Sequence, residues 1–327
     1  MQWKMARPGR LGLRFNLWAM KRGFPALAFI APRWPRWLLL VGARAVITVV
    51  MAFNPRPKAA IRRNLARLLG EAPGSRRVRL ALRQMLHHYA YSWMDLFRFA
   101  QLPSERARQL LDRARGQEHL ERAGAQGRPV ILLTAHLGAW ELGGVFIEQL
   151  GLPLSVVYVP DQYQLAEAFR SRWRARSGVE EIAIRPGASL ASLPVLRALK
   201  GGRVVALQGD RDFDGRGLDM EFFGAPAPFP SGPFVLARMT GAVLIPTFIA
   251  YTSGYRFEIG FGEPIAVDAG GTQRLTGVEE AMRRWVEVLE DAVRRWPTQW
   301  HTFYDFWEGG REGPAAGSGR RAAGHDA

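Results

Sequence analysis

The hydrophobic and polar positions between residues 129 and 261 follow two alternating patterns. Short apolar runs typical of β-strands alternate with stretches whose apolar residues return every three or four positions, as on one face of an α-helix. The order is typical of an α/β fold, so we predict a mixed, mostly parallel central sheet flanked by helices, with an antiparallel edge. We expect strands at 129–134, 153–159, 180–184, 203–208, 243–250 and 255–261, and helices at 140–150, 164–177, 189–200 and 232–240.

Helical segments flank this region on both sides. An aromatic-rich helix is expected at about residues 80–100. After the last strand, Thr276 and Glu279 form a capping box that marks a helix start, and Pro297 marks its end. In open α/β sheets, ligands bind at the carboxyl ends of the strands. The chemistry is therefore expected near residues 134–141 and in the loop after residue 207.

Positive charge is concentrated in the N-terminal third of the chain. Residues 1–70 contain 14 Lys and Arg and no acidic residue, and the first 115 residues carry +19, whereas the remaining residues carry −3. Such a segment prefers anionic phosphates, which a membrane surface, an acidic carrier protein or a nucleic acid can present. No RNA-binding signature or zinc-finger spacing accompanies the charge, so nucleic acid is disfavoured as a partner.

The apolar segment at 24–53 narrows these choices. It contains Trp34 and Trp37, but Arg33, Arg36 and Arg44 interrupt it, and its charge-free runs are too short for a bilayer span of about 20 residues. The pattern favours a helix or hairpin in the membrane interface, with Trp at headgroup depth and Arg reaching lipid phosphates. The alternative is a buried helical layer with a basic rim. The basic residues also disfavour a cleaved signal peptide.

Length and composition fit one large domain, or one and a half. With 327 residues, of which 48% are hydrophobic, the chain can bury a large core. We predict a basic, apolar helical membrane-association region at 1–115, an α/β core at 116–308, and a disordered tail at 309–327, which has no large apolar residue. The sequence has no cysteine, which excludes disulfides, thiolate metal sites and a Cys nucleophile.

A histidine and an acid follow the first strand, in the stretch HLGAWELGG. Glu141 comes five residues after His136, an H-x4-E arrangement. Five residues along a helix leave two side chains roughly 140° apart, so the pair meets only if His136 lies in the turn before the helix. Glu141 would then accept a hydrogen bond from one ring nitrogen, which makes the other a base for a hydroxyl group. The alternative is a capping histidine and a glutamate that faces solvent.

The loop after the strand at 203–208 satisfies a calcium-loop pattern. Asp210, Asp212, Asp214 and Glu221 are the acids of a complete D-x-D-x-D-G-x5-E match, but a strand precedes the loop and prolines follow it, whereas an EF-hand loop joins two helices. A second interpretation is that Asp210, Arg211 and Asp212 project into the site, with Arg211 towards a phosphate and the carboxylates towards hydroxyls or arginines. A third is a polar loop with internal salt bridges. We predict no metal site.

Four arginines lie at every second position of the helix expected at 164–177. They spread around the helix, so only one or two of Arg170, Arg172, Arg174 and Arg176 can face the site. The sequence contains no motif of serine hydrolases, P-loop NTPases, zinc proteases or dinucleotide-binding enzymes. These classes are therefore unsupported.

Several motifs, taken in order, resemble those of the lipid A biosynthesis (late) acyltransferases and their lysophospholipid acyltransferase relatives, which include bacterial phosphatidylinositol mannoside acyltransferases. The resemblance covers roughly residues 30–307. It rests on RRNL (62–65), TAHLGAWELGG (134–144), the D-R-D loop followed by EFFGAPAPFPSGPFVLAR (221–238), TGAVLIPTF (240–248) and PTQWH (297–301). Many lipid A acyltransferases have Arg-Pro and D-Q-D where this chain has Val159-Pro160 and Asp210-Arg211-Asp212.

The resemblance implies a glycerolipid-acyltransferase-like fold and an enzyme that moves a fatty acyl chain from acyl carrier protein or coenzyme A to a hydroxyl of a membrane lipid. The acceptor would be a lipid A precursor, a lysophospholipid or a glycolipid. The basic region would hold the protein, as a peripheral or monotopic one, on the cytoplasmic face of the bacterial inner membrane, and would dock acyl carrier protein. No cofactor is implied beyond the thioester co-substrate.

The resemblance also implies roles for individual residues. It matches His136 with the general base and Glu141 with its orienting partner, and it matches a substrate-contacting arginine and a following glycine with Arg174 and Gly178. The other candidate substrate-binding residues are Gly138, Trp140, Asp210, Arg211 and Asp212.

We expect direct transfer without an acyl-enzyme, because no serine or cysteine occupies an activated position. The hydroxyl would lose its proton to His136, and donors near Gly138 or an arginine would stabilise the oxyanion. Two other classes remain open. One is a catalytically inactive lipid-binding protein with the same fold, and the other is a calcium-regulated membrane protein that uses the 210–221 loop.

Overall fold

The computed structural model describes residues 19–148, 150–160, 164–184, 192–213, 215–267 and 276–309. A seven-stranded sheet in the order β1-β9-β8-β2-β5-β3-β4 forms its centre. The strands are β1 (Leu111–Arg115), β2 (Val130–Thr134), β3 (Leu154–Tyr158), β4 (Glu180–Ala183), β5 (Val204–Gln208), β8 (Val243–Tyr251) and β9 (Phe257–Phe261). Strands β8, β2, β5, β3 and β4 run parallel, whereas β9 is antiparallel to β8. The predicted fold class is confirmed.

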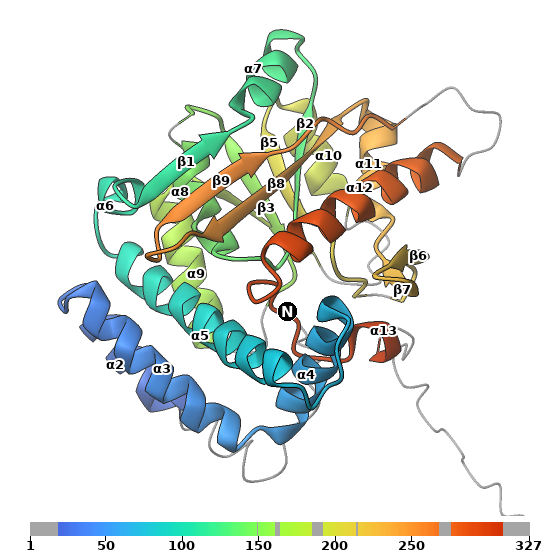
Figure 1. Ribbon diagram of the computed structural model, residues 1–327. Coiled ribbons are helices and arrows are strands. Elements are labelled where there is room, and N and C mark those ends of the chain that lie inside the picture. Colours follow the sequence, from blue (N-terminus) through green and yellow to red (C-terminus); the bar gives the residue numbers. More distant parts are fainter. Residues whose placement is uncertain are drawn as a thin grey trace, which may run out of the picture.

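Helices cover both faces of the sheet and one of its ends (Figure 1). They are η1 (Ala19–Gly23), α2 (Phe24–Ile30), α3 (Arg36–Ala52), α4 (Pro55–Leu69), α5 (Arg76–Phe99), α6 (Ser104–Arg108), α7 (Gln117–Ala125), η2 (Trp140–Leu142), α8 (Gly143–Glu148), α9 (Gln164–Arg176), α10 (Leu193–Lys200), α11 (Gly232–Thr240), α12 (Thr276–Arg295) and α13 (Phe306–Gly309). Helix α5 lies at the end of the sheet towards which β8 points, so the helical layer meets the carboxyl ends of the parallel strands (Figure 1).

The continuously apolar sequence of β2 reflects its central place in the sheet. Its side chains alternate between two hydrophobic clusters. Val130 and Leu132 pack in the cluster that contains α5, whereas Ile131 and Leu133 pack in the one that contains α12. Because both faces are buried, both sets of alternating positions must be apolar.

Two features of the β-structure were not predicted. Strand β1 pairs with β9 at the edge of the sheet, and its sequence LDRAR is mostly exposed, so it lacks the apolar alternation of a strand. A separate antiparallel hairpin, β6 (Leu218–Phe222) and β7 (Ala225–Phe229), follows the 210–217 loop. The sheet therefore begins inside the segment at 1–115, and the division of the chain at 115/116 stays a prediction. Asp214, the side chain of Thr276 and residues 310–327 of the expected tail lie outside the described residues.

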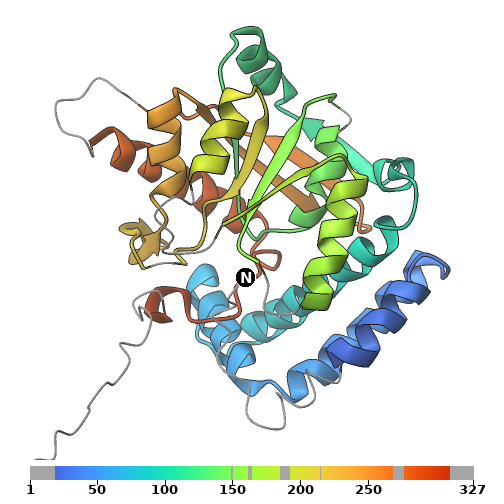
Figure 2. The same cartoon turned by 180° about the vertical axis from the view of Figure 1, so that it is seen from behind.

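The N-terminal helices form an outer layer beside α5. Helices α2 and α3, in blue, lie outside α5 in both Figure 1 and Figure 2. Arg36 and Arg44 of α3 point inward, to Asp95 and to the hydroxyls of Tyr91 and Tyr255. The expectation that these two arginines reach lipid phosphates is therefore wrong.

The hydropathy of these helices sets a limit on how they can meet a membrane. Among the described residues, no single helix has both the length and the apolar composition to cross a bilayer. Helices α3 and α4 reach that length and composition only together, across a bend of 106°.

Candidate functional site

The turn that carries His136 follows directly after β2 and is fixed by the chain on both sides. Gly138 has φ +63°, and a Cβ atom there would lie 2.0 Å from the carbonyl oxygen of Ile249, so only glycine fits. The N–H of Gly138 donates to the carbonyl of Gln299 (2.8 Å), and that of His301 to the carbonyl of His136 (2.8 Å). Residues 299–301 of the PTQWH motif thus run alongside the turn.

Asp210 holds the imidazole of His136. It follows β5, which pairs with β2, so the carboxyl ends of the two strands bring the residues together. Oδ1 of Asp210 lies 2.8 Å from Nδ1 of His136, and Oδ2 accepts from the backbone N–H of His136 (3.0 Å) and from Nε1 of Trp300 (3.1 Å). A carboxylate at Nδ1 favours the tautomer that carries its proton there, which leaves Nε2 as the basic nitrogen.

Burial governs the electrostatics of this pair. Burial lowers the pKa of His136, the charge of Arg211 lowers it further, and the contact with Asp210 only partly opposes them, so the net shift is downward. For Asp210, burial by itself raises the pKa, but the contacts with His136 and Arg211 outweigh it and the pKa falls below its ordinary value. The pair therefore rests as a neutral imidazole beside an ionised carboxylate.

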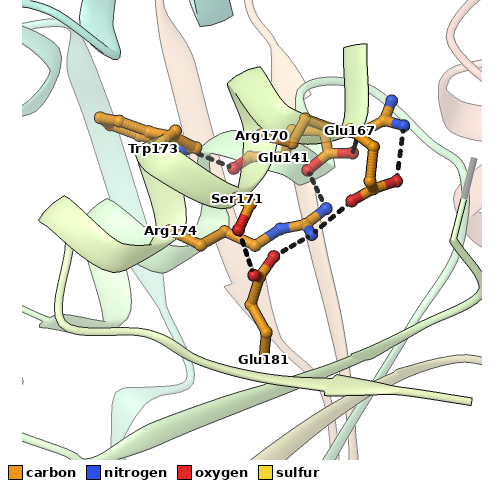
Figure 3. Close-up of polar contacts among 7 residues, drawn as sticks. All are labelled: Glu141, Glu167, Arg170, Ser171, Trp173, Arg174 and Glu181. Atoms are coloured by element: carbon orange, nitrogen blue, oxygen red, sulfur yellow. Dashed lines mark hydrogen bonds and ion pairs between the residues drawn. The ribbon is translucent and has the colours of Figure 1, made fainter. Parts of the chain in front are cut away.

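Glu141 does not fill the place expected for it beside Nδ1, because Asp210 occupies that place. Its carboxylate is held instead by Arg174 (Nη2 to Oε2, 3.2 Å) and Arg170 (Nε to Oε1, 3.7 Å), as Figure 3 shows. Glu141 lies in the single 3-10 turn η2, which directs it towards α9. The prediction that Glu141 orients His136 through a ring nitrogen is wrong, although a catalytic role for Glu141 stays a prediction.

The two arginines that hold Glu141 belong to a larger charged cluster. Arg174 also pairs with Glu181 (2.7 Å) and Glu167 (3.4 Å), and Arg170 pairs with Glu167 (3.2 Å) (Figure 3). Four positions separate Arg170 and Arg174, so both lie on the buried face of α9, whereas Arg172 and Arg176 are exposed. The prediction that only one or two of the four arginines can face the site is confirmed.

The remaining candidates divide between the site and its scaffold. The ring of Trp140 lies 5.4 Å from that of His136, between centroids. Gly138 holds the turn, and its N–H is already engaged, which argues against an oxyanion donor there. Arg211 donates to the carbonyl of His301, and Asp212 accepts from the N–H groups of Gly215 and Gly217. The expectation that Arg211 points towards a phosphate and Asp212 towards hydroxyls or arginines is thus wrong. Both residues form bonds within the protein that stabilise the loop.

The contacts of the 210–221 loop argue against a calcium site. The carboxylate of Asp210 is bonded to His136, and that of Asp212 accepts from N–H groups of its own loop. Glu221 lies in strand β6, whereas a calcium loop requires the start of a helix at this position. Among the described residues, no cluster of three His, Asp or Glu side chains could hold a metal ion.

A cavity of about 120 Å³ opens beside His136. Its polar lining includes His136, Trp140, Glu141, Tyr158 and Arg174. Its remaining wall is mainly apolar and comes from β2, β3, β5, β8, α8, α9 and the turn before β4, with Leu132, Ile147, Leu154, Val156, Val179 and Ile249 among its side chains. Gly143 and Gly144 keep α8 close to this wall, because Cβ atoms there would lie 2.9 Å from Ile249 Cδ1 and 3.0 Å from Val179 Cγ2. The site thus joins an imidazole–carboxylate pair to a narrow apolar cavity.

Sequence reasoning missed several parts of this site. The contact between Asp210 and His136 spans 74 residues and has no spacing that a sequence pattern can show. Trp300 belongs to the quoted PTQWH motif, but its bond to Asp210 could not be predicted. Tyr158 and the pair Gly143-Gly144 gave only the weak signal of their places at the end of a strand and within a motif.

Known proteins are similar to this chain in sequence. The model of the bacterial lipid A biosynthesis acyltransferase family matches residues 13–308. A phosphatidylinositol mannoside acyltransferase of Mycobacterium tuberculosis is 31% identical over 202 residues, which cover 61% of this chain and 63% of that protein. A lipid A biosynthesis palmitoleoyltransferase of Escherichia coli is 32% identical over 164 residues, or 48% of this chain and 51% of that protein.

A third relative, a lipid A biosynthesis acyltransferase of Haemophilus influenzae, is 27% identical over 189 residues, 57% of this chain and 55% of that protein. The chain thus spans less than two thirds of the length of these three relatives. The family match itself is much longer. It takes in every strand of the sheet, the turn of His136 and the loop of Asp210, and it shows that the chain belongs to the bacterial lipid A biosynthesis acyltransferase family.

Proposed function

We propose that this chain is an O-acyltransferase that moves a fatty acyl chain from a thioester, acyl carrier protein or acyl-coenzyme A, to a hydroxyl of a membrane lipid. The observation that supports this most directly is the His136–Asp210 pair, whose imidazole lies on the wall of a mainly apolar cavity. A neutral, oriented imidazole is the equipment that activates a hydroxyl, and a narrow apolar cavity suits a hydrocarbon chain.

The reaction would proceed in one displacement on the thioester. The acceptor hydroxyl attacks the carbonyl carbon and gives its proton to Nε2 of His136, while Asp210 stabilises the imidazolium that forms. The tetrahedral intermediate then expels the thiolate, which takes the proton from His136, and the C–S bond is replaced by an ester C–O bond. Arg170 and Arg174 line the cavity and hold Glu141 at its wall.

Glu141 has a different part in this mechanism. Its negative charge favours the protonated form of His136, but it affects the pKa of His136 less than burial, Arg211 and Asp210 do, and it makes no direct contact with Nδ1. Its carboxylate also lies on the cavity wall, where it can accept a hydrogen bond from a hydroxyl of the acceptor. We therefore assign Glu141 to acceptor positioning and Asp210 to orientation of the base.

The acceptor and the location follow from the relatives and the charge distribution. The names of the relatives point to a lipid A precursor or a phosphoinositide glycolipid, and a lysophospholipid would use the same chemistry. The acid-free N-terminal 70 residues favour an anionic membrane surface and an acidic carrier protein as partners. We infer peripheral or monotopic attachment to the cytoplasmic face of the bacterial inner membrane.

Mass spectrometry of membrane lipids tests the proposal. Cells that express the wild type should contain lipids one acyl chain heavier than those in cells that express His136→Ala at equal level. The mass and fragmentation of these lipids would also name the acceptor. Identical lipid profiles would instead favour a catalytically inactive lipid-binding protein.

Purified variants test the assignment of the orienting carboxylate. Asp210→Asn should lower the transfer rate by about 10² or more, because an amide disfavours the productive tautomer. Asp291→Asn, at an exposed position of α12, should leave the rate unchanged. The wild-type rate should fall only below pH 6.5, since burial lowers the pKa of His136. If Asp210→Asn keeps the wild-type rate while Glu141→Gln loses it, Glu141 is the orienting partner after all.

A further inference from the structure

Large exposed apolar side chains gather on one part of the molecule. Twelve such residues occur in the described chain, and seven of them lie between residues 29 and 53. Trp37 is 67% exposed and Val41 52%. The other five are Phe29, Trp34, Val46, Val49 and Phe53. A concentration of this kind marks a surface that is covered in use.

Helix α3 is divided into two halves along its length. The inner half buries Leu39, Leu40, Ala43, Ile47 and Met51. The opposite half, which we call the α3 outer face, contains Trp37, Val41, Gly42, Ala45, Val46, Thr48, Val49, Ala52 and Phe53, all of them exposed and none charged. A helix that faced water would place its charges on this side.

The two charges of α3 lie on the inner half instead. Arg36 forms a two-bond ion pair with buried Asp95 (2.7 Å each) and donates to the carbonyl of Tyr255 (2.6 Å). Arg44 donates to the hydroxyls of Tyr91 and Tyr255. Asp95 also accepts from the hydroxyl of Tyr251 in β8 (3.0 Å). The arginines are therefore occupied in attaching α3 to α5 and to the sheet.

The surroundings of the α3 outer face indicate what covers it. The face is apolar, with the indole of Trp37 near one end and exposed Trp34 shortly before the helix, and the sequence segment that contains it, residues 1–70, has 14 basic residues and no acid. Indoles favour the boundary between headgroups and acyl chains, and basic residues favour anionic headgroups. A bilayer with anionic lipids satisfies both requirements.

We propose that α3 lies flat in the surface of an anionic bilayer, with its outer face among the lipids and its inner face fixed to the protein. This inference rests on the proposed function, since a lipid acceptor requires contact with a bilayer. Its 17 residues span only about 25 Å, less than the hydrocarbon core of about 30 Å. Crossing with α4 would also break the ion pair with Asp95.

The same helices connect the membrane surface to the site. Phe24 of α2 packs against Phe97 of α5 and Phe169 of α9, with ring centroids 4.7 and 5.7 Å away. Helix α9 carries Arg170 and Arg174, which line the cavity. Helix α2, which precedes α3 in the chain, is thus packed against both α5 and the helix that carries these two arginines.

Vesicle binding tests the surface. With the full-length protein and vesicles of phosphatidylglycerol and phosphatidylethanolamine, Trp37→Glu and Val41→Glu should each weaken binding at least about tenfold. Met239→Glu is the matched control, because Met239 is 65% exposed on α11, away from this face, and binding should stay at the wild-type level. Wild-type binding by the α3 variants would overturn the proposal, as would a wild-type dimer that Trp37→Glu dissociates without any effect on vesicles.

The orientation of α3 has its own test, because the chain has no native cysteine. Spin labels at Val41→Cys, Ala45→Cys, Thr48→Cys and Ala52→Cys lie on one side of the helix over about 16 Å of its axis. Oxygen and nickel accessibility should place all four at similar depth in the vesicle, whereas depths that change steadily along the series would show a spanning helix.

Acyl transfer to an acceptor dispersed in detergent separates this inference from the proposed function. Trp37→Glu should keep that activity while it loses vesicle binding. His136→Ala should bind vesicles as the wild type does, whatever its activity.

Discussion

Substitution of Gly138 by alanine tests how the turn of His136 is built. Two costs add at this position. The first is the left-handed backbone, φ +63°, which disfavours a side chain by about 1–2 kcal/mol. The second is the close approach to β8, where the new Cβ would lie 2.0 Å from the Ile249 oxygen and 2.9 Å from Ala250 Cα. Backbone must move to relieve that contact.

The movement would disturb buried hydrogen bonds on both sides of the turn. The N–H of Gly138 donates to Gln299, and that of Ala139 donates to Ile249 (2.9 Å). Each buried donor left unpaired costs about 1–3 kcal/mol, so with the backbone cost we expect Gly138→Ala to lower the free energy of unfolding by about 3–8 kcal/mol in total. Acyl transfer should fall with it, because His136 moves with the turn.

Gly151→Ala is the matched control. Its φ is +66°, nearly that of Gly138, but no atom lies within 4 Å of a Cβ there. It should show only the backbone cost of about 1–2 kcal/mol and should keep its activity. Urea denaturation followed by tryptophan fluorescence measures both variants. Equal losses of stability would refute the close approach to β8 and with it this account of the turn.

Three further predictions follow from the site. Arg174→Gln should lower the transfer rate at least about tenfold and reduce stability, because it leaves partly buried carboxylates unpaired. Arg172→Gln, on the exposed side of α9, should change neither the rate nor the stability. Kinetic and thermal-melting assays measure both variants. Burial holds the pKa of His301 well below 6.5, so the unfolded chain binds a proton at this histidine more readily than the folded protein does. The melting temperature should therefore fall as pH drops below 6.5, and it should fall less steeply in His301→Gln. Gly144→Ala should shift the products towards shorter acyl chains in mass spectrometry, because its methyl group would narrow the cavity at Val179, and Gly124→Ala, with open space around it, should not.

Much of the fold could be predicted from local patterns. The strands of the parallel sheet are continuous apolar runs because their two faces are both buried, and this leaves a clear signal in the sequence. Strand β1 left no such signal, because it is an exposed edge whose identity comes from pairing with β9, more than 140 residues away in the chain. Pairing of this kind depends on backbone hydrogen bonds and is independent of side-chain pattern.

The site shows the same limit at the level of single residues. The sequence indicated His136 and Asp210, since each directly follows the carboxyl end of a parallel strand. It paired His136 with Glu141 because they are neighbours in the chain, but the 3-10 turn at 140–142 directs Glu141 to Arg170 and Arg174. The adjacency of β2 and β5, which are separated by β3 and β4 in sequence, instead brings Asp210 to the imidazole.

The sequence by itself determined the fold class, the strands and helices of the core, the strand end that holds the histidine, and the excess of positive charge near the N-terminus. These are local properties, set by the spacing of side chains along a few turns or one strand. Only the tertiary structure decided which carboxylate meets His136, which arginines enclose Glu141, and that Arg36 and Arg44 turn inward while α3 exposes its apolar face. Those outcomes depend on contacts between distant segments, whose energies no local pattern records.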